Sequence, residues 1–173
     1  MTAKGHVLLA SAFGYIPLNS LSDLYSPLDL TLAFSFLIFG SLLPDIDEPK
    51  SYIGQRSFYI SHFLKLMGLQ HRTMTHWLIT PVLIAIFAYL IDDRFFSLIF
   101  FSLAFGMLAH DIGDLLTKGG IKGFFFPFFK NTKIGLLPYA IRFQTFSTTE
   151  MFFNSLLIGV NLYLYSSLTV KVF

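Results

Sequence analysis

Three short motifs in this chain combine aspartate and histidine side chains: Pro-Asp-Ile-Asp at 44–47, His-Arg-Thr-Met-Thr-His at 71–76 and His-Asp-Ile-Gly-Asp at 110–114. His110 and Asp114 are four residues apart, so they share one face of a helix and can bind the same ion. Asp45 and Asp47 are two apart and cannot share a helical face, so one would bind an ion while the other bridges a second ion or orients a histidine. The chain has no cysteine, and any metal would therefore be held by imidazole and carboxylate groups.

The candidate donors outnumber the ligands of a single ion. A catalytic zinc commonly takes three protein ligands and a water molecule, whereas the metal candidates here are His6, Asp45, Asp47, His71, His76, His110, Asp111 and Asp114. We therefore expect two divalent ions, with zinc favoured over manganese or magnesium because imidazole suits zinc. A pair of ions about 3.5–4 Å apart can activate a bridging water and hold an anionic substrate, which is the usual arrangement for hydrolysis of a phosphate ester.

Other charged residues supply the remaining catalytic candidates. Arg72 stands beside a histidine and can hold the oxygens of a phosphate group, and Arg142 is a second candidate for this role. We expect Asp45 or Asp47 to manage the proton. Glu150, immediately before the last apolar segment, completes the set.

The composition indicates that membrane helices position these residues. Hydrophobic residues make up 54% of the 173 positions and charged residues only 13%, about half of the usual share in soluble domains. The mean hydropathy is +0.66, and apolar stretches recur along the whole chain, so we expect a polytopic membrane protein. The five apolar segments are His6–Leu18, Leu28–Leu43, Trp77–Ile91, Phe95–Ala109 and Met151–Val170. Only the last reaches about 20 residues, the length that spans a bilayer core.

If the five segments cross the membrane in turn, all three motifs, His6 and Glu150 lie at the same face. That face also carries ten of the twelve basic residues, leaving Arg94 and Lys171 opposite. By the positive-inside rule it is cytoplasmic. We therefore expect an all-α polytopic bundle of four to five transmembrane or membrane-embedded helices. It forms a single domain over residues 1–173, in the inner membrane of a prokaryote, with a metal site facing the cytoplasm.

Two stretches between the segments suit the membrane interface. Ser57–Leu69 alternates apolar and polar residues in the manner of an amphipathic helix on the membrane surface. Gly119–Pro138 contains glycines and the run Phe124–Phe129, interrupted by a proline, so we expect no helix there but an interfacial anchor or a re-entrant segment.

Four blocks together carry a family resemblance: Gly-His at 5–6, Gly-Ser-Leu-Leu-Pro-Asp-Ile-Asp at 40–47, His-Arg-Thr-Met-Thr-His at 71–76 and His-Asp-Ile-Gly-Asp-Leu-Leu-Thr at 110–117. In this order they resemble the inner-membrane metal-dependent hydrolases of bacteria and archaea whose best-known member is LexA-regulated. The resemblance implies metal binding or catalysis at the eight metal candidates, and a role for Glu150. More distantly, His110 and Asp114 are similar to a motif of the zinc-dependent phospholipase C and single-strand nuclease superfamily. That superfamily has later histidines, which this chain lacks after His110, so the likeness does not extend to a complete three-zinc site.

These observations favour a membrane-bound metal-dependent hydrolase of a phosphate ester at the cytoplasmic leaflet. Membrane lipids are the expected partners, and a phospholipid or lipid-linked phosphate is favoured over a soluble ester. Nucleic acid is not expected, because no basic stripe interleaved with stacking aromatics is present. The alternatives are a non-enzymatic metal or proton transporter and a scaffold stabilised by metal. A conduit would need ionisable groups at mid-depth, and the apolar segments carry none there.

Overall fold

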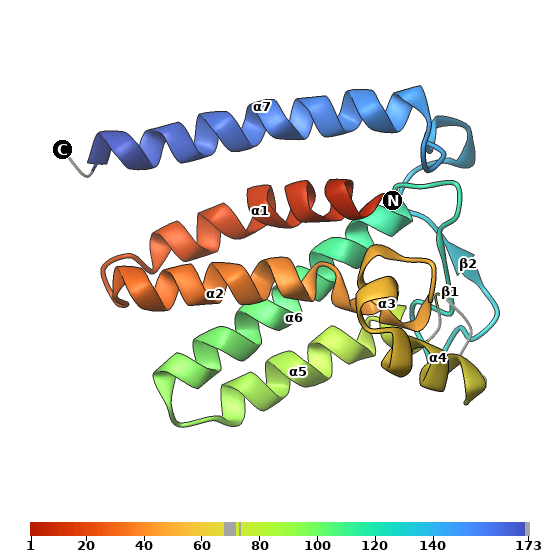
Figure 1. The fold of residues 1–173 in the computed structure, drawn as a ribbon, viewed down its shortest axis with the longest axis horizontal. Helices are drawn as coiled ribbons and strands as arrows, with labels where there is room; N and C mark the ends of the chain where they lie inside the picture. The colour runs from red at the N-terminus through yellow and green to blue at the C-terminus, as the bar shows by residue number, and fades with distance from the viewer. Residues whose placement is uncertain (68–71, 73, 172–173) are drawn as a thin grey trace.

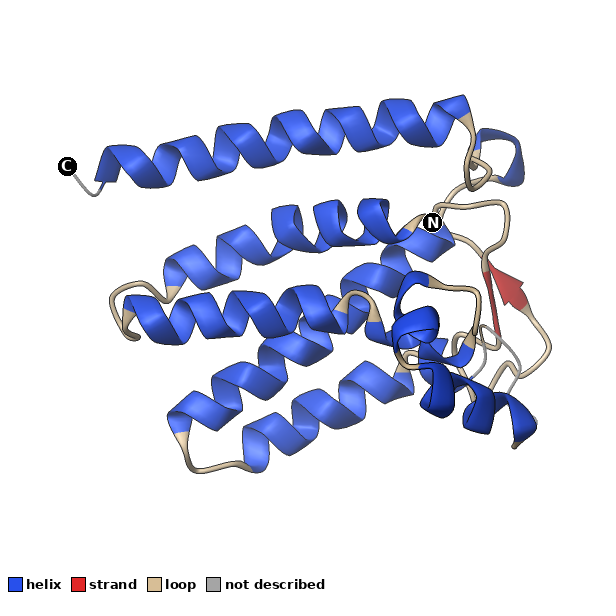
Figure 2. Ribbon diagram, viewed as in Figure 1, coloured by secondary structure: helices blue, strands red, loops and turns tan. Residues whose placement is uncertain are grey.

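The computed structural model describes residues 1–67, 72 and 74–171, and most of them are helical (Figure 2). The long helices lie side by side and are α1 (Ala3–Ser20), α2 (Pro27–Gly40), α5 (Ile79–Leu90), α6 (Arg94–Leu115) and α7 (Thr148–Lys171) (Figure 1). The shorter elements gather at one end of this bundle and are η1 (Leu43–Asp47), α3 (Tyr52–Arg56), α4 (Phe58–Leu66), η2 (Met74–His76), β1 (Ile121–Lys122), β2 (Lys133–Ile134) and η3 (Tyr139–Ile141).

The helices begin where the sequence supplies caps. Ser26 and Asp29 form a capping box at the start of α2, and the Asp93 side chain accepts from the Phe96 N–H at the start of α6. Each predicted apolar segment corresponds to one long helix. The predicted fourth segment ended at Ala109, but α6 continues to Leu115 because residues 110–114 extend the same helix instead of leaving it.

α6 is the central helix and packs against α1, α2 and α5, while α7 lies against α1. Glycines allow its closest approach to α2: a side chain at Gly106 would meet the Leu37 carbonyl, and one at Gly40 would meet the Leu103 carbonyl. Leu37 is almost fully buried beside them. The backbones of α2 and α6 therefore approach each other closely at these two glycines. The histidine and aspartate motifs follow, after the end of α2 and in the last turns of α6.

Within the described residues, α6 is the one helix that is long and apolar enough to cross a membrane by length and composition. Its 22 residues rise about 33 Å. The apolar helices α2 and α5 are shorter. The sequence singled out Met151–Val170 as the full-length segment. The corresponding helix α7 has 24 residues, and the structure adds α6 as a second helix of sufficient length, because the charged motif at 110–114 is helical.

The strictly all-α prediction needs one correction. Residues 119–138 contain no helix, as expected, but they include a small antiparallel hairpin that pairs Ile121 with Ile134 and Lys122 with Lys133. Gly120 and Gly123 have positive φ angles on either side of β1, a conformation that glycine adopts without strain. Along Ser57–Leu69, the structure gives α4 to Leu66 and a turn at Met67, and residues 68–69 lie outside the described residues.

Candidate metal centre

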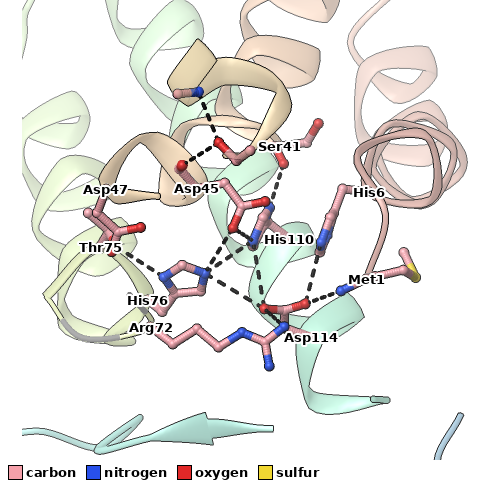
Figure 3. A network of polar contacts seen from close by, with 12 residues as sticks. Met1, His6, Ser41, Asp45, Asp47, Arg72, Thr75, His76, His110 and Asp114 are labelled. Carbon is pink, nitrogen blue, oxygen red and sulfur yellow. Dashed lines mark hydrogen bonds and ion pairs between the residues drawn. The ribbon is translucent and has the colours of Figure 1, made fainter. Parts of the chain in front are cut away.

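Four donor side chains from three elements converge at the end of the bundle where the short elements gather (Figure 3). His110 and Asp114 project from the last turns of α6, Asp45 from η1 and His76 from η2. η1 follows directly on α2, so the α2–α6 contact fixes Asp45 relative to His110. Three of the four donors are fully or almost fully buried, and the Asp45 side chain is 20% exposed.

The donor atoms are spaced as a metal ion requires. The His76 and His110 Nε2 atoms are 3.2 Å apart, and Asp45 Oδ1 lies 3.7 Å and 3.6 Å from them. Asp114 Oδ2 lies 3.7 Å from His76 Nε2 and 4.0 Å from His110 Nε2. Zinc bonds of about 2.0–2.1 Å in a tetrahedron place neighbouring ligand atoms about 3.3 Å apart. The distances from each carboxylate to the two imidazoles are therefore close to the spacing of a tetrahedral site.

Both imidazoles are held so that Nε2 offers a lone pair. His110 Nδ1 lies 2.7 Å from the Ser41 carbonyl, which only accepts, so Nδ1 carries the hydrogen. The Thr75 hydroxyl donates to Asp47 Oδ2 at 2.8 Å and accepts from His76 Nδ1 at 3.0 Å. Hydrogen bonds of this kind on the far nitrogen are what orient histidine ligands in metal sites.

Two lone pairs that face each other at 3.2 Å repel, so the arrangement requires a positive charge between them, either a proton or a metal ion. Two carboxylates beside them favour the same charge. Burial opposes ionisation of Asp45, but positive charge at His110 and a hydrogen bond from His76, which a proton between the two imidazoles would supply, hold its pKa well below the usual range. Asp45 is therefore a charged ligand at neutral pH, and the donor set fits a divalent ion.

His6 completes the inner wall of the cluster. Its ring stacks on His110 with centroids 3.6 Å apart, and its Nε2 lies 3.4 Å from Asp114 Oδ1. Gly113 lies under the ring, where a Cβ would come within 3.1 Å of His6 Nδ1. His6, Asp45 and His110 make a second possible donor group, which shares His110 with the group of His76, His110 and Asp114.

Two cationic groups also reach Asp114. The Arg72 guanidinium pairs with Asp114 Oδ2 at 2.9 Å and donates to the Gly120 carbonyl at 3.1 Å. The amino group of Met1 contacts Asp114 Oδ1. The Arg72 side chain is 22% exposed, whereas that of Asp114 is 1% exposed, so Arg72 lies at the edge of the donor cluster.

The remaining candidates from the sequence analysis lie at different positions relative to the donor cluster. Asp47 is 3% exposed and acts on His76 through Thr75, so it is in the orienting role that the sequence left open for one of the two aspartates. Asp111 is fully buried, and neither of its carboxylate oxygens has a hydrogen-bond partner in the described parts of the chain. His71 lies outside the described residues.

Glu150 and Arg142 bind backbone groups rather than the donor cluster. The Glu150 oxygens accept from the Thr2 and Phe146 N–H groups, each at 2.6 Å. The Arg142 guanidinium donates to the carbonyls of Leu137 and Gly135 at 2.6 and 3.3 Å. Glu150 therefore joins the start of α7 to the residue that precedes α1, and Arg142 stabilises the loop after β2.

Sequence reasoning missed two residues, Ser41 and Thr75. Ser41 acts through its backbone carbonyl, which no side-chain pattern reveals. Thr75 stands directly before His76, and a hydroxyl adjacent to a candidate ligand was the available signal.

Comparison with known proteins gives the family. Residues 1–171 match the family described as YdjM inner membrane protein. The chain belongs to this family. It is 33% identical over 125 residues to the inner membrane protein YdjM of Escherichia coli K12 and, equally, to that of Shigella flexneri. The match covers 70% of this chain and 63% of each relative, so the chain spans under two thirds of the length of the relatives it matches. No solved structure matches. The family membership and the apolar α6 agree with the inner-membrane location that the sequence predicted.

Proposed function

We propose that this YdjM-family chain is a metal-dependent hydrolase of a phosphate ester, and that its substrate is a phospholipid or a lipid-linked phosphate. The observation that carries the proposal is the pair of Nε2 lone pairs of His76 and His110, which face each other at 3.2 Å between Asp45 and Asp114. This is a donor set for zinc before manganese or magnesium, because two of the four ligands are imidazoles.

The long helices suit a membrane bundle with the metal centre at its cytoplasmic end. Their outward faces carry exposed apolar side chains, as a lipid-facing surface requires; these include Phe36, Leu83, Phe87, Phe96, Phe152 and Leu156. Helices α2 and α5 reach across with the help of their flanking residues. The basic residues of the loops at the metal end orient that end toward the cytoplasm.

A bound divalent ion would supply a water molecule of lowered pKa and positive charge for the phosphate oxygens. The residues of the chain then divide the remaining tasks. Arg72, at the edge of the cluster, binds a phosphate oxygen through its guanidinium. Thr75 and Asp47 hold the His76 ring, and His6 packs against His110 on the buried side, which excludes solvent there.

Asp45 is suited to the proton transfer because its carboxylate is the accessible one of the donor set. In hydrolysis the water oxygen would bond to phosphorus as its proton passes to Asp45, and the bond from phosphorus to the leaving oxygen would break as Asp45 returns this proton to that oxygen. The two-ion prediction needs donors beyond these four, and His6, which forms a second possible donor group with Asp45 and His110, is the available one.

The position of the centre favours a lipid substrate. It lies at the ends of the apolar helices, and exposed apolar side chains of α4 and of the loop after β1 surround this end of the molecule; these include Tyr59, Phe63, Leu66, Phe128 and Phe129. A phosphate at headgroup depth can reach Arg72, while acyl or polyprenyl chains lie against these surfaces.

The test combines metal analysis with turnover. The full chain, purified in detergent, is assayed with zinc or manganese on vesicles of mixed phospholipid and polyprenyl phosphate, and on a soluble chromogenic phosphodiester. We expect metal-dependent cleavage of a lipid phosphate that a chelator abolishes and that His110→Ala eliminates together with bound metal.

His62 provides the matched control, because it is half-buried on α4 and its ring contacts the Phe58 carbonyl and the Phe58 ring rather than the donor cluster. His62→Ala should keep metal and activity. Cleavage of the soluble ester alone, with Arg72→Ala as active as the wild type, contradicts the lipid assignment. Bound metal without turnover of any ester contradicts the hydrolase and favours the transporter or scaffold.

A further inference from the structure

The hairpin of β1 and β2 opposes two lysines of like charge. Lys122 and Lys133 are directly paired in its register, and both are exposed. Opposite residues of an antiparallel pair have Cβ atoms about 4.5–5.5 Å apart, and like charges in such a pair are destabilising. The buried Ile121 and the partly buried Ile134 on the other side fix this register against Leu115 and Phe124. The fold therefore holds two exposed lysines of like charge opposite each other on its surface.

Nothing in the surrounding sequence balances these charges. The segment between Asp114 and Glu150 contains no acidic residue and carries five basic ones, Lys118, Lys122, Lys130, Lys133 and Arg142. Arg142 is committed to backbone carbonyls. The ion pairs found among the described residues include none at Lys122, Lys130 or Lys133. An anion between the paired lysines would relieve their repulsion.

An apolar loop adjoins the lysine pair. Phe128 is 83% exposed and Phe129 58% exposed, whereas Phe126 stacks on Trp77 with ring centroids 3.8 Å apart and has the Lys130 ammonium 5.4 Å above it. The loop is thus fixed to the bundle on one side and presents phenylalanines beside lysines on the other. Aromatic rings at the boundary of the acyl chains with cations at headgroup level are the arrangement that binds anionic membrane surfaces.

We propose that the β1–β2 hairpin binds the phosphate headgroup of an anionic membrane lipid between Lys122 and Lys133, with Lys130 beside it and Phe128 and Phe129 among the acyl chains. This lipid is not the substrate: the site binds it and does not cleave it. The hairpin packs on Leu115, next to Asp114, and its loop packs on Trp77, next to His76. A lipid bound there steadies the two elements that carry these metal-site donors.

The single tryptophan of the chain provides the measurement. Trp77 lies against the hairpin, since a Cβ at Gly123 would be 3.4 Å from its Nε1 atom. The full chain is reconstituted in phosphatidylcholine membranes that contain increasing fractions of brominated phosphatidylglycerol or of brominated phosphatidylcholine, and quenching of Trp77 fluorescence reports which lipid is bound beside it. We expect half-maximal quenching at a clearly lower fraction of phosphatidylglycerol.

Lys122→Glu is the decisive variant because it creates a favourable Glu–Lys pair across the hairpin and so preserves its folding. It should lower the preference for phosphatidylglycerol about fivefold or more, as expected when the attraction of one lysine to an anionic surface is lost. Lys122→Gln should also lower the preference for phosphatidylglycerol, although it adds no negative charge. Lys50→Glu, an exposed lysine at the same end outside the hairpin, should keep the wild-type preference.

Two results overturn the proposal: equal quenching by the two lipids in the wild type, or equal losses in the Lys122 and Lys50 variants. Relief of the quenching by millimolar inorganic phosphate would also contradict it, since the site would then bind free phosphate instead of a lipid. The Asp45→Ala variant separates this site from the metal centre. It should retain the lipid preference, whether or not the protein hydrolyses any ester.

Discussion

The Thr75 hydroxyl joins Asp47 to His76, and its removal tests how the metal centre is held. Thr75→Val replaces the hydroxyl with a methyl group of similar size, so the packing around residue 75 is preserved. Two hydrogen bonds disappear, of 2.8 Å to Asp47 and 3.0 Å to His76. His76 then loses the hydroxyl that accepts the hydrogen on Nδ1, and a hydrogen on Nε2 would block metal binding.

The expected loss follows from these two bonds. A hydrogen bond to a charged group contributes about 1.5–3 kcal/mol and a neutral one about 0.5–1.5 kcal/mol, and part of this energy becomes the cost of reorienting the ring when the ion binds. Loss of an outer hydrogen-bond partner typically weakens metal affinity 10- to 100-fold. We expect roughly 10- to 60-fold weaker zinc binding, which corresponds to about 1.5–2.5 kcal/mol.

The assay is a competition titration against a chromogenic zinc chelator with the full chain in detergent. Thr75→Ser keeps the hydroxyl and should bind zinc within about threefold of the wild type. His76→Ala should lose the ion. If Thr75→Val binds zinc as tightly as the wild type while His76→Ala does not, the Asp47–Thr75 pair does not orient the ligand and the reasoning is wrong.

Three further predictions address the stability of the fold and its orientation in the membrane. Gly106→Val should destabilise the bundle by about 1–3 kcal/mol, because its side chain meets the α2 backbone; Gly159→Val, where nothing lies within 4 Å, should keep the wild-type thermal midpoint in the same melt. Glu150→Ala should lower stability by about 2–4 kcal/mol through loss of two charge-assisted bonds, yet metal analysis should find the full metal content, since this carboxylate binds backbone amides; a proportional loss of metal would make it a ligand. Because the chain has no cysteine, Asp93→Cys should react with an impermeant thiol reagent added outside intact cells, and Lys122→Cys only after lysis. The reverse pattern would invert the orientation.

The gathering of the motifs at one end could be deduced from the sequence. Consecutive apolar segments reverse direction, so the ends of the second and fourth segments and the start of the third share a face, whatever their packing. The helical period likewise places His110 and Asp114 on one side of α6. The sequence also shows that the chain has no cysteine and that two of the candidate ligands are imidazoles, which limits the metal ligands to histidine and carboxylate side chains. These conclusions depend on order and spacing along the chain, which the sequence contains in full.

The tertiary structure determined which role each candidate residue takes in the site. His76 and His110 are separated by 34 residues, and their 3.2 Å contact depends on how η2 and α6 are placed by the packing of α5 on α6. The fold of η1, which contains both aspartates, directs Asp45 toward the histidines and Asp47 toward Thr75. The pairing of Lys122 with Lys133 in the hairpin likewise depends on how the two strands are placed in the folded chain. Periodicity describes one element at a time, whereas a metal site and a paired strand are distances between elements, and only the packed chain sets those.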